Sequence, residues 1–160
     1  GKELPANEVG EICVQGIPGR TFIKEYYKDP EETAKLMRKD GWMFTGDKGY
    51  LDEDGWLFFV DRKVNMIKRS GENIASKEVE NVIASHLAVN EAAVIGVDDP
   101  IRDQAVKAII QLKKGISCPD EEILEYCRER LADFKVPTII EFCDDFPRTC
   151  TGKIQKNCLQ

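Results

Sequence analysis

The chain has 160 residues, 42% of them hydrophobic, with a mean hydropathy of -0.39. This length can bury one moderate core or two small ones, and no apolar run approaches the ~20 residues that a membrane-spanning helix needs, so no membrane span is expected. A net charge of -6 and an isoelectric point near 5.0 argue against nonspecific nucleic-acid binding, which needs a positive field to displace counterions.

The first part of the chain predicts a strand around residues 10–16 and then a helix from about Pro30 to Lys39. Asp29 is a suitable N-cap, and Pro30 fits the first helical position because its missing N–H is not needed there. Two glutamates follow in the first turn, where the helix dipole favours negative charge.

A hairpin is expected next. Two apolar segments, residues 50–51 and 56–60, lie on either side of an acidic turn, residues 52–55, which ends in glycine. This pattern predicts that the two segments pair antiparallel.

The chain is expected to divide just after Arg62, into domains of residues 1–62 and 63–160. The elements predicted in the second part are a strand, a turn at Ser70-Gly71, a helix over 77–86, strands over 92–97 and 105–112, a helix over 119–132 and a strand over 138–142. Apolar residues at i, i+3 and i+4 in both helices predict that the helices pack on one face of a sheet. The expected fold class is therefore α+β, with a β-rich first part and a small mixed α/β second part.

The six cysteines and the single histidine do not have the spacing of a metal site or a disulfide framework, and no Cys-x-x-Cys occurs. Cys13 lies in a strand and Cys127 on the apolar stripe of a helix, so most cysteines are expected to be small buried hydrophobes in a cytoplasmic protein. His86 is expected at the last turn of a helix, where a charged imidazole favours the helix dipole. No metal ligand is predicted.

Three polar segments carry the candidate chemistry: residues 40–50, 59–74 and 147–156. In the last, Gly152 allows a tight turn and Lys153 extends a movable positive charge that suits a phosphate. Each segment also has an ordinary structural interpretation. Lys153 would then be a solvated surface lysine, Asp47 a turn-stabilising carboxylate and Arg62 an edge-strand charge.

In this order, the three segments resemble the acidic-turn, hinge and catalytic-lysine motifs of the adenylate-forming superfamily, which includes acyl-CoA synthetases, adenylation domains and luciferases. The resemblance extends over nearly the whole chain, because residues 10–16 and 25–33 are similar to the preceding family motif. It implies that residues 1–62 end a large N-terminal domain and that residues 63–160 form a C-terminal catalytic lid. Among the subgroups, the crotonobetaine and carnitine CoA ligases are the most similar, through residues 16–19, 62–69 and 101–105.

The resemblance also implies roles for particular residues. Lys153 would bridge the substrate carboxylate, the α-phosphate and the ribose during adenylation. Asp47 and Arg62 would bind the ATP ribose, and Val64 would stand at the hinge about which the lid rotates. The hairpin tip that would then line the pantetheine tunnel comprises Ser70, Gly71 and Glu72; a plain β-turn is the alternative, and the neighbouring Lys68 and Arg69 are expected to be solvated.

Two positions differ from the family pattern. Many relatives have Asp or Lys at the hinge position that Val64 occupies, and many have Gly where this chain has Asp103. Valine removes the side-chain charge but does not exclude a hinge, because hinge residues need only absorb a change of backbone torsion.

The activity that the resemblance implies is an ATP-dependent acyl-CoA ligase that acts on a carboxylic acid, with ATP, Mg²⁺ and CoA. The family's phosphate-binding loop does not occur in these residues, so the chain is expected to be an inactive fragment that needs the missing N-terminal domain. Two alternatives stay open: an enzyme that loads a carrier-protein thiol, and a noncatalytic binding module that keeps the lid fold.

Overall fold

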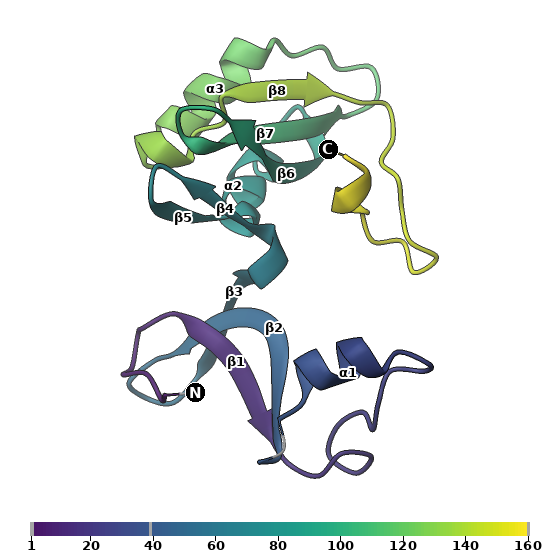
Figure 1. The fold of residues 1–160 in the computed structure, drawn as a ribbon. Helices are drawn as coiled ribbons and strands as arrows, with labels where there is room; N and C mark the ends of the chain where they lie inside the picture. Colours follow the sequence, from purple (N-terminus) through teal and green to yellow (C-terminus); the bar gives the residue numbers. More distant parts are fainter. Residues whose placement is uncertain (1, 39, 160) are drawn as a thin grey trace. The chain divides into compact units, whose positions relative to one another are not determined.

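The structure is a computed structural model that describes residues 2–38 and 40–159 (Figure 1). The chain forms two compact units, Gly1–Val64 and Asn65–Gln160, and they divide close to the boundary expected at Arg62. Among the described residues, no helix has both the length and the apolar character required to cross a membrane.

The first unit is an antiparallel sheet of three strands with one short helix. The strands are β1 (Gly10–Gln15), β2 (Trp42–Leu51) and β3 (Leu57–Arg62), in the order β1-β2-β3, and the helix is α1 (Pro30–Leu36). The predicted hairpin is confirmed, since β2 and β3 pair antiparallel. Asp52 stabilises its turn, where its carboxylate accepts hydrogen bonds from the backbone N–H groups of Asp54 and Trp56 at 3.0 and 2.8 Å.

Helix α1 begins as predicted. Asp29 Oδ1 accepts a hydrogen bond from the Glu32 backbone N–H at 3.0 Å, and Pro30 occupies the first turn. The helix ends at Leu36, because Met37 is extended and pairs with Met43. Lys39, the predicted end of the helix, lies outside the described residues.

The second unit is a mixed five-stranded sheet with two helices. Its strands are β4 (Met66–Arg69), β5 (Glu72–Ala75), β6 (Val89–Asp99), β7 (Asp103–Leu112) and β8 (Ile139–Phe142). The order is β5-β4-β7-β6, with β8 pairing parallel to β7 and all other pairs antiparallel. The helices are α2 (Ser76–Ala84) and α3 (Asp120–Arg128), and the short 3₁₀ segments are η1 (Lys63–Asn65), η2 (Asp133–Lys135) and η3 (Lys156–Cys158).

The side chains of β6 and β7 alternate between two apolar cores. Val94 of β6 and Val106 and Ile110 of β7 belong to the larger core, together with both helices. The helix residues in this core are Val79, Ile83, Ile123 and Cys127. The prediction that the two helices share one face of the sheet is therefore confirmed.

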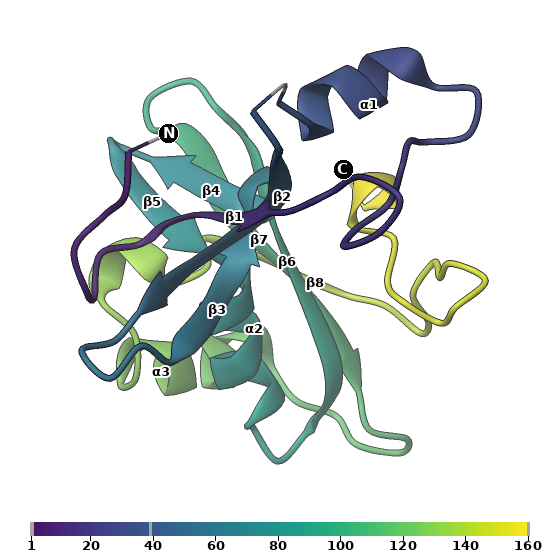
Figure 2. The ribbon, with the colours of Figure 1, turned by 90° about the horizontal axis from the view of Figure 1, so that it is seen from below.

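The other face of the sheet is covered by the C-terminal segment. Ala93, Ile95 and Ile109 form a second core with Phe146, and Ile154 and Leu159 pack against it. In Figure 2, the strands of the larger sheet run between α2 and α3 on one side and the yellow C-terminal segment on the other.

The structure corrects two expectations about cysteine and histidine. All six cysteines are free, but most are not buried: Cys118 and Cys127 are buried, Cys13 and Cys143 half-buried, and Cys150 and Cys158 exposed. Cys150 lies in the turn of the C-terminal hairpin and Cys158 in η3. His86 lies past the end of α2 instead of in its last turn, and it is buried.

Candidate functional site

Asp47 and Arg62 meet across β2 and β3. They are register partners, and Arg62 Nε lies 3.2 Å from Asp47 Oδ1. The side chains of Arg62 and Asp47 are 65% and 31% exposed. An ion pair this accessible to water contributes about 1 kcal/mol or less to stability, so fold stability alone does not explain its position.

A bulge in β2 takes Asp47 out of the pairing with β1, whereas its pairing with Arg62 of β3 is kept. The pairing with β1 passes from Glu11 opposite Lys48 to Cys13 opposite Phe44, with a register shift in between. Within the bulge, Thr45 Oγ1 donates to the Ile12 carbonyl at 2.8 Å and accepts from the Asp47 N–H at 3.1 Å. Gly46 adopts a φ of +74°, a conformation that favours glycine.

Val64 lies in η1, at the point where the two compact units divide. Its side chain is 86% exposed, so it makes little packing contact with either unit. Lys63, the residue before it, lies 3.4 Å from Glu11 within the first unit. A substitution at Val64 would therefore act mainly through the backbone, and the hinge assignment stays a prediction.

Ser70 and Gly71 form the tip of the β4–β5 hairpin. Their φ values of +52° and +86° are those of a type I′ turn, which matches the twist of the flanking strands. An added Cβ at Gly71 would meet nothing within 4 Å, so glycine is favoured by its φ and not by lack of space. The Ser70 N–H donates to the Arg102 carbonyl at 2.9 Å, which ties the tip to the β6–β7 turn. Ser70, Gly71 and Glu72 are all exposed.

Arg69 corrects the sequence interpretation, because it is buried and not solvated. Its Nη1 donates to the carbonyls of Phe134 and Val136 at 2.7 and 3.1 Å, so it joins β4 to the η2 segment. Desolvation lowers the pKa of the Arg69 guanidinium. Lys68 is exposed, as expected.

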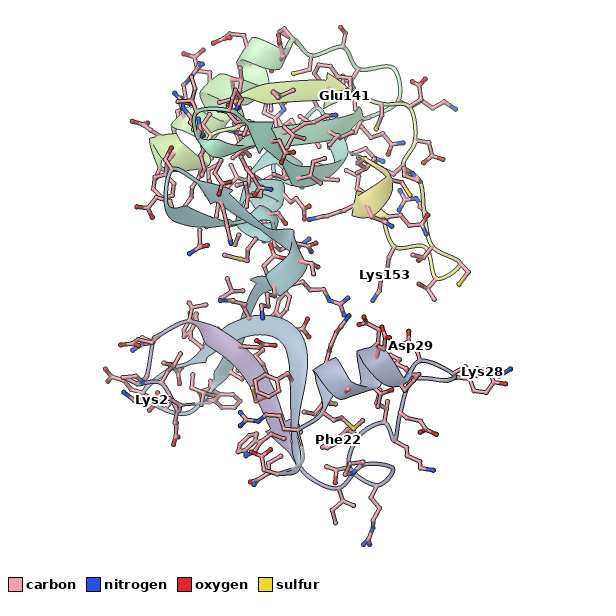
Figure 3. All side chains as sticks on the ribbon, viewed as in Figure 1. Lys2, Phe22, Lys28, Asp29, Glu141 and Lys153 are labelled. Atoms are coloured by element: carbon pink, nitrogen blue, oxygen red, sulfur yellow. The ribbon has the colours of Figure 1, made fainter. Side chains whose placement is uncertain are left out.

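Lys153 stands on a short hairpin of residues 147–155. The Thr149 N–H donates to the Lys153 carbonyl at 2.8 Å, and the Gly152 N–H closes the turn on Thr149 at 2.9 Å. Gly152 has a φ of +83°, as the predicted tight turn requires. Within the described part of the chain, the Lys153 ammonium has no ion-pair partner, and Figure 3 shows the side chain extending away from the larger sheet.

Ion pairs hold this hairpin on both sides of Lys153. Arg148 pairs with Glu91 of β6 and donates Nη1 to the Gly152 carbonyl at 3.1 Å. Lys156 lies 2.6 Å from Glu80 of α2. The sequence motifs pointed to Lys153 but did not predict the two ion pairs that anchor its hairpin. The signal available in the sequence was that Glu80 shares the helical stripe of buried apolar residues in α2.

One group of possible metal ligands lies elsewhere in the described residues: atoms of His86, Cys118 and Glu122 within 4.8 Å of one another. The Ala88 N–H donates to His86 Nδ1 at 3.3 Å, which leaves the imidazole proton on Nε2, 3.5 Å from Glu122. Burial raises the pKa of the Cys118 thiol. Both ring nitrogens of His86 therefore already have a polar neighbour in the fold, and we assign no metal to this group.

Known proteins similar to this chain are AMP-binding enzymes. Residues 78–153 match the family of the AMP-binding enzyme C-terminal domain. The crotonobetaine/carnitine–CoA ligase of Citrobacter koseri is 49% identical over 99% of this chain and 31% of the ligase.

Solved structures agree with this match. ATP-bound MatB from Rhodopseudomonas palustris has a TM-score of 0.89 at 36% identity and covers 99% of this chain and 31% of MatB. The o-succinylbenzoate CoA synthetase MenE from Bacillus subtilis, in complex with the acyl-adenylate intermediate OSB-AMP, has a TM-score of 0.88 at 37% identity. That match covers 98% of this chain and 31% of MenE.

These matches define the class. The chain is similar to adenylate-forming enzymes, and its residues 78–153 match the AMP-binding enzyme C-terminal domain. Its curated relatives are named crotonobetaine/carnitine–CoA ligases, and the chain spans 31% of their length. Lys153 is the last residue of the segment that matches the family.

Proposed function

We propose that the chain is the C-terminal part of an ATP-dependent acyl-CoA ligase. Such an enzyme converts a carboxylic acid and ATP into an acyl-adenylate and pyrophosphate, and then transfers the acyl group to CoA. The observation that carries the proposal is the position of Lys153. It projects without an ion-pair partner, among the described residues, from a hairpin that is anchored on both sides, in a domain homologous to AMP-binding enzymes.

The proposal gives Lys153 an electrostatic role in adenylation. This reaction brings a carboxylate against the α-phosphate of ATP, so two anions must approach and negative charge concentrates in the transition state. A lysine on a fixed turn supplies a compact positive charge, and its flexible stem lets that charge follow the reacting oxygens.

Asp47 and Arg62 would hold the ribose of ATP. A carboxylate can accept hydrogen bonds from two vicinal hydroxyls, and Asp47 is partly exposed to do so. Arg62 uses Nε toward Asp47, so its Nη groups are the donors that would face the same ribose. The pair would orient the nucleotide without taking part in bond making.

The second half-reaction would use the other two predicted elements. Rotation about Val64 would bring the tip of Ser70, Gly71 and Glu72 to the site, where its exposed backbone lines the path of the pantetheine thiol. The tip suits this use because its bond to the Arg102 carbonyl keeps it in one conformation.

The remaining parts of the enzyme would lie in the N-terminal domain that precedes this chain. Large apolar side chains of the first unit are exposed, including Trp56, Leu57 and Phe59, and that domain would cover them. It would supply the phosphate loop, the acyl pocket and the Mg²⁺ ligands. Carnitine and crotonobetaine are the first acids to test, because curated relatives carry those names. The free cysteines fit the reducing cytoplasm as the location.

The test is Lys153→Ala in the full-length protein, with Lys114→Ala as a control that removes an exposed lysine of the same unit. Acid-dependent ATP/pyrophosphate exchange should fall by the equivalent of about 3 to 4 kcal/mol, and thioester formation from supplied acyl-adenylate should persist. Equal loss in both assays would make Lys153 structural. If the enzyme transfers the acyl group to a carrier-protein thiol but not to CoA, the acceptor is the carrier protein. If it adenylates none of the acids tested, the noncatalytic alternative is favoured.

A further inference from the structure

Glu80 is a buried carboxylate at the open edge of the larger sheet. Its side chain is 8% exposed, on the face of α2 that also buries Val79 and Ile83. Its Oε1 accepts a hydrogen bond from the Val94 backbone N–H at 3.0 Å. Because β6 is the last strand of the sheet order, this N–H points to an edge without another strand, and Glu80 satisfies it.

Lys156 brings the C-terminal segment to the same carboxylate. Its ammonium lies 2.6 Å from Glu80 Oε1 and donates to Ser76 Oγ at 2.7 Å. Ser76 begins α2, whereas Ile154 and Leu159, on either side of Lys156, pack on the opposite face of the sheet. Lys156 therefore passes the edge of β6 and joins the two faces.

We propose that the Glu80–Lys156 pair positions Lys153 for adenylation. Lys153 lies three residues before Lys156, the first residue of η3. The Glu80–Lys156 pair therefore sets where the hairpin leaves the sheet. The pair is also the more buried of the two hairpin anchors, since the Lys156 and Glu80 side chains are 21% and 8% exposed and the Arg148–Glu91 pair is more open. The kinetic part of this inference rests on the function proposed for Lys153.

A buried ion pair of this kind is better suited to fixing a geometry than to adding stability. Desolvation of the two charges offsets much of their attraction. Loss of Lys156 would leave the buried Glu80 carboxylate with the more exposed Lys77 ammonium, 3.6 Å from its Oε2, which lies on α2 itself and does not hold the C-terminal segment. The segment that carries Lys153 has few apolar contacts beyond Phe146, Ile154 and Leu159. Without the pair, only these contacts and the more open Arg148–Glu91 pair would hold the hairpin, so the position of the Lys153 ammonium would be less well fixed.

The experiment compares Lys156→Met with Lys107→Met in the full-length protein. Lys107 is a matched control: it pairs with Glu141 at 2.9 Å, its side chain is 17% exposed, and it lies on β7, outside the C-terminal hairpin. Both substitutions remove one charge and keep an unbranched stem. Lys156→Arg restores the charge, and Glu80→Gln is a milder second variant that keeps an acceptor for the Val94 N–H.

Two readouts are needed. Amide hydrogen exchange of residues 147–155 should become about 10-fold faster in Lys156→Met, with β6 and β7 unchanged. The kcat of pyrophosphate exchange should fall about 10-fold, because a small displacement of a catalytic group is costly, and acyl transfer from preformed adenylate should change less than about twofold. Lys156→Arg should recover both readouts, and Glu80→Gln should be intermediate.

The inference is overturned if Lys156→Met behaves like Lys107→Met in both readouts. It is also overturned if both half-reactions fall equally while exchange accelerates throughout the second unit, since the pair would then only stabilise the fold. Lys153→Ala is run beside these variants. If Lys153→Ala leaves adenylation intact, the function proposed for Lys153 fails, and the kinetic role of the Glu80–Lys156 pair fails with it. The hydrogen-exchange readout would still decide whether the pair anchors the hairpin.

Discussion

Arg62, at the end of β3, donates through Nε to the carboxylate of Asp47 over 3.2 Å, across to the bulge of β2. The bulge aims Asp47, and the register of the two strands puts Arg62 opposite to it. The hydrogen bond restrains both side chains, so under the proposed function a ribose would have less side-chain freedom to remove on binding.

Asp47→Asn should weaken nucleotide binding in the full-length enzyme. The substitution keeps the size of the side chain but removes the charge that strengthens hydrogen bonds to two hydroxyls, so KM for ATP should rise roughly 10- to 100-fold. Glu11→Gln is the matched control, because Glu11 pairs with Lys63 at 3.4 Å in the same unit. Steady-state kinetics at varied ATP concentration measure this KM. An equal rise of KM in both variants would show that Asp47 does not bind the ribose.

Val64→Pro should separate the two half-reactions. Proline fixes φ near -65° and deletes one N–H, so it restricts the backbone rotation that the hinge prediction places there. Pyrophosphate exchange should persist, because the conformation in which Lys153 takes part in adenylation forms before the rotation. Single-turnover transfer to CoA should fall, because it needs the rotation. Val64→Ala is the control, since the exposed side chain contributes little packing. Undiminished transfer would move the hinge to Lys63 or Asn65.

Asp103→Val should weaken the β6–β7 turn by about 1 to 2 kcal/mol, because Asp103 has a φ of +70° and a β-branched residue is strained there. Asp103→Gly should be tolerated, since glycine adopts this φ without strain. Asp98→Val is the control, because Asp98 is exposed on β6 and has no positive φ. Hydrogen exchange of the β6–β7 amides measures the difference, and equal protection in Asp103→Val and Asp98→Val would refute the strain.

The cysteines should alkylate in an order set by burial. Cys150 and Cys158 are exposed and should react first with iodoacetamide. Burial raises the pKa of Cys127 from 9.0 to about 11, so at about pH 8 only about one Cys127 thiol in 1,000 would be ionised, and the side chain is covered as well. Mass spectrometry of the native protein follows the order, and a denatured sample is the control. Early labelling of Cys127 would contradict the buried position.

The raised pKa of Cys127 also makes the stability of the fold depend on pH. The folded state holds the Cys127 proton more tightly than the unfolded state, so this contribution is complete below about pH 9 and is lost as the pH rises toward about 11. Protection of α3 amides, measured across this range, should therefore decline at alkaline pH. A rise in protection would show that the thiol is not desolvated.

Local chemistry made several elements predictable. Asp29 and Pro30 mark the start of α1, and Gly71, which accepts positive φ, marks the turn of the β4–β5 hairpin. The helical stripes in α2 and α3 show which face meets the sheet. Helix ends were less accurate, because α1 stops where Met37 pairs with Met43, a contact that the helix pattern does not contain.

The sequence by itself determined the motifs and, through them, the candidate residues Asp47, Arg62 and Lys153, because their turns and neighbours lie within a few residues of them. The tertiary structure decided what holds these residues. The Glu80–Lys156 pair and the burial of Arg69 under η2 join positions far apart in the chain. Such contacts depend on strand order and on which face of the sheet each segment covers, and these are set by the packing of the whole unit.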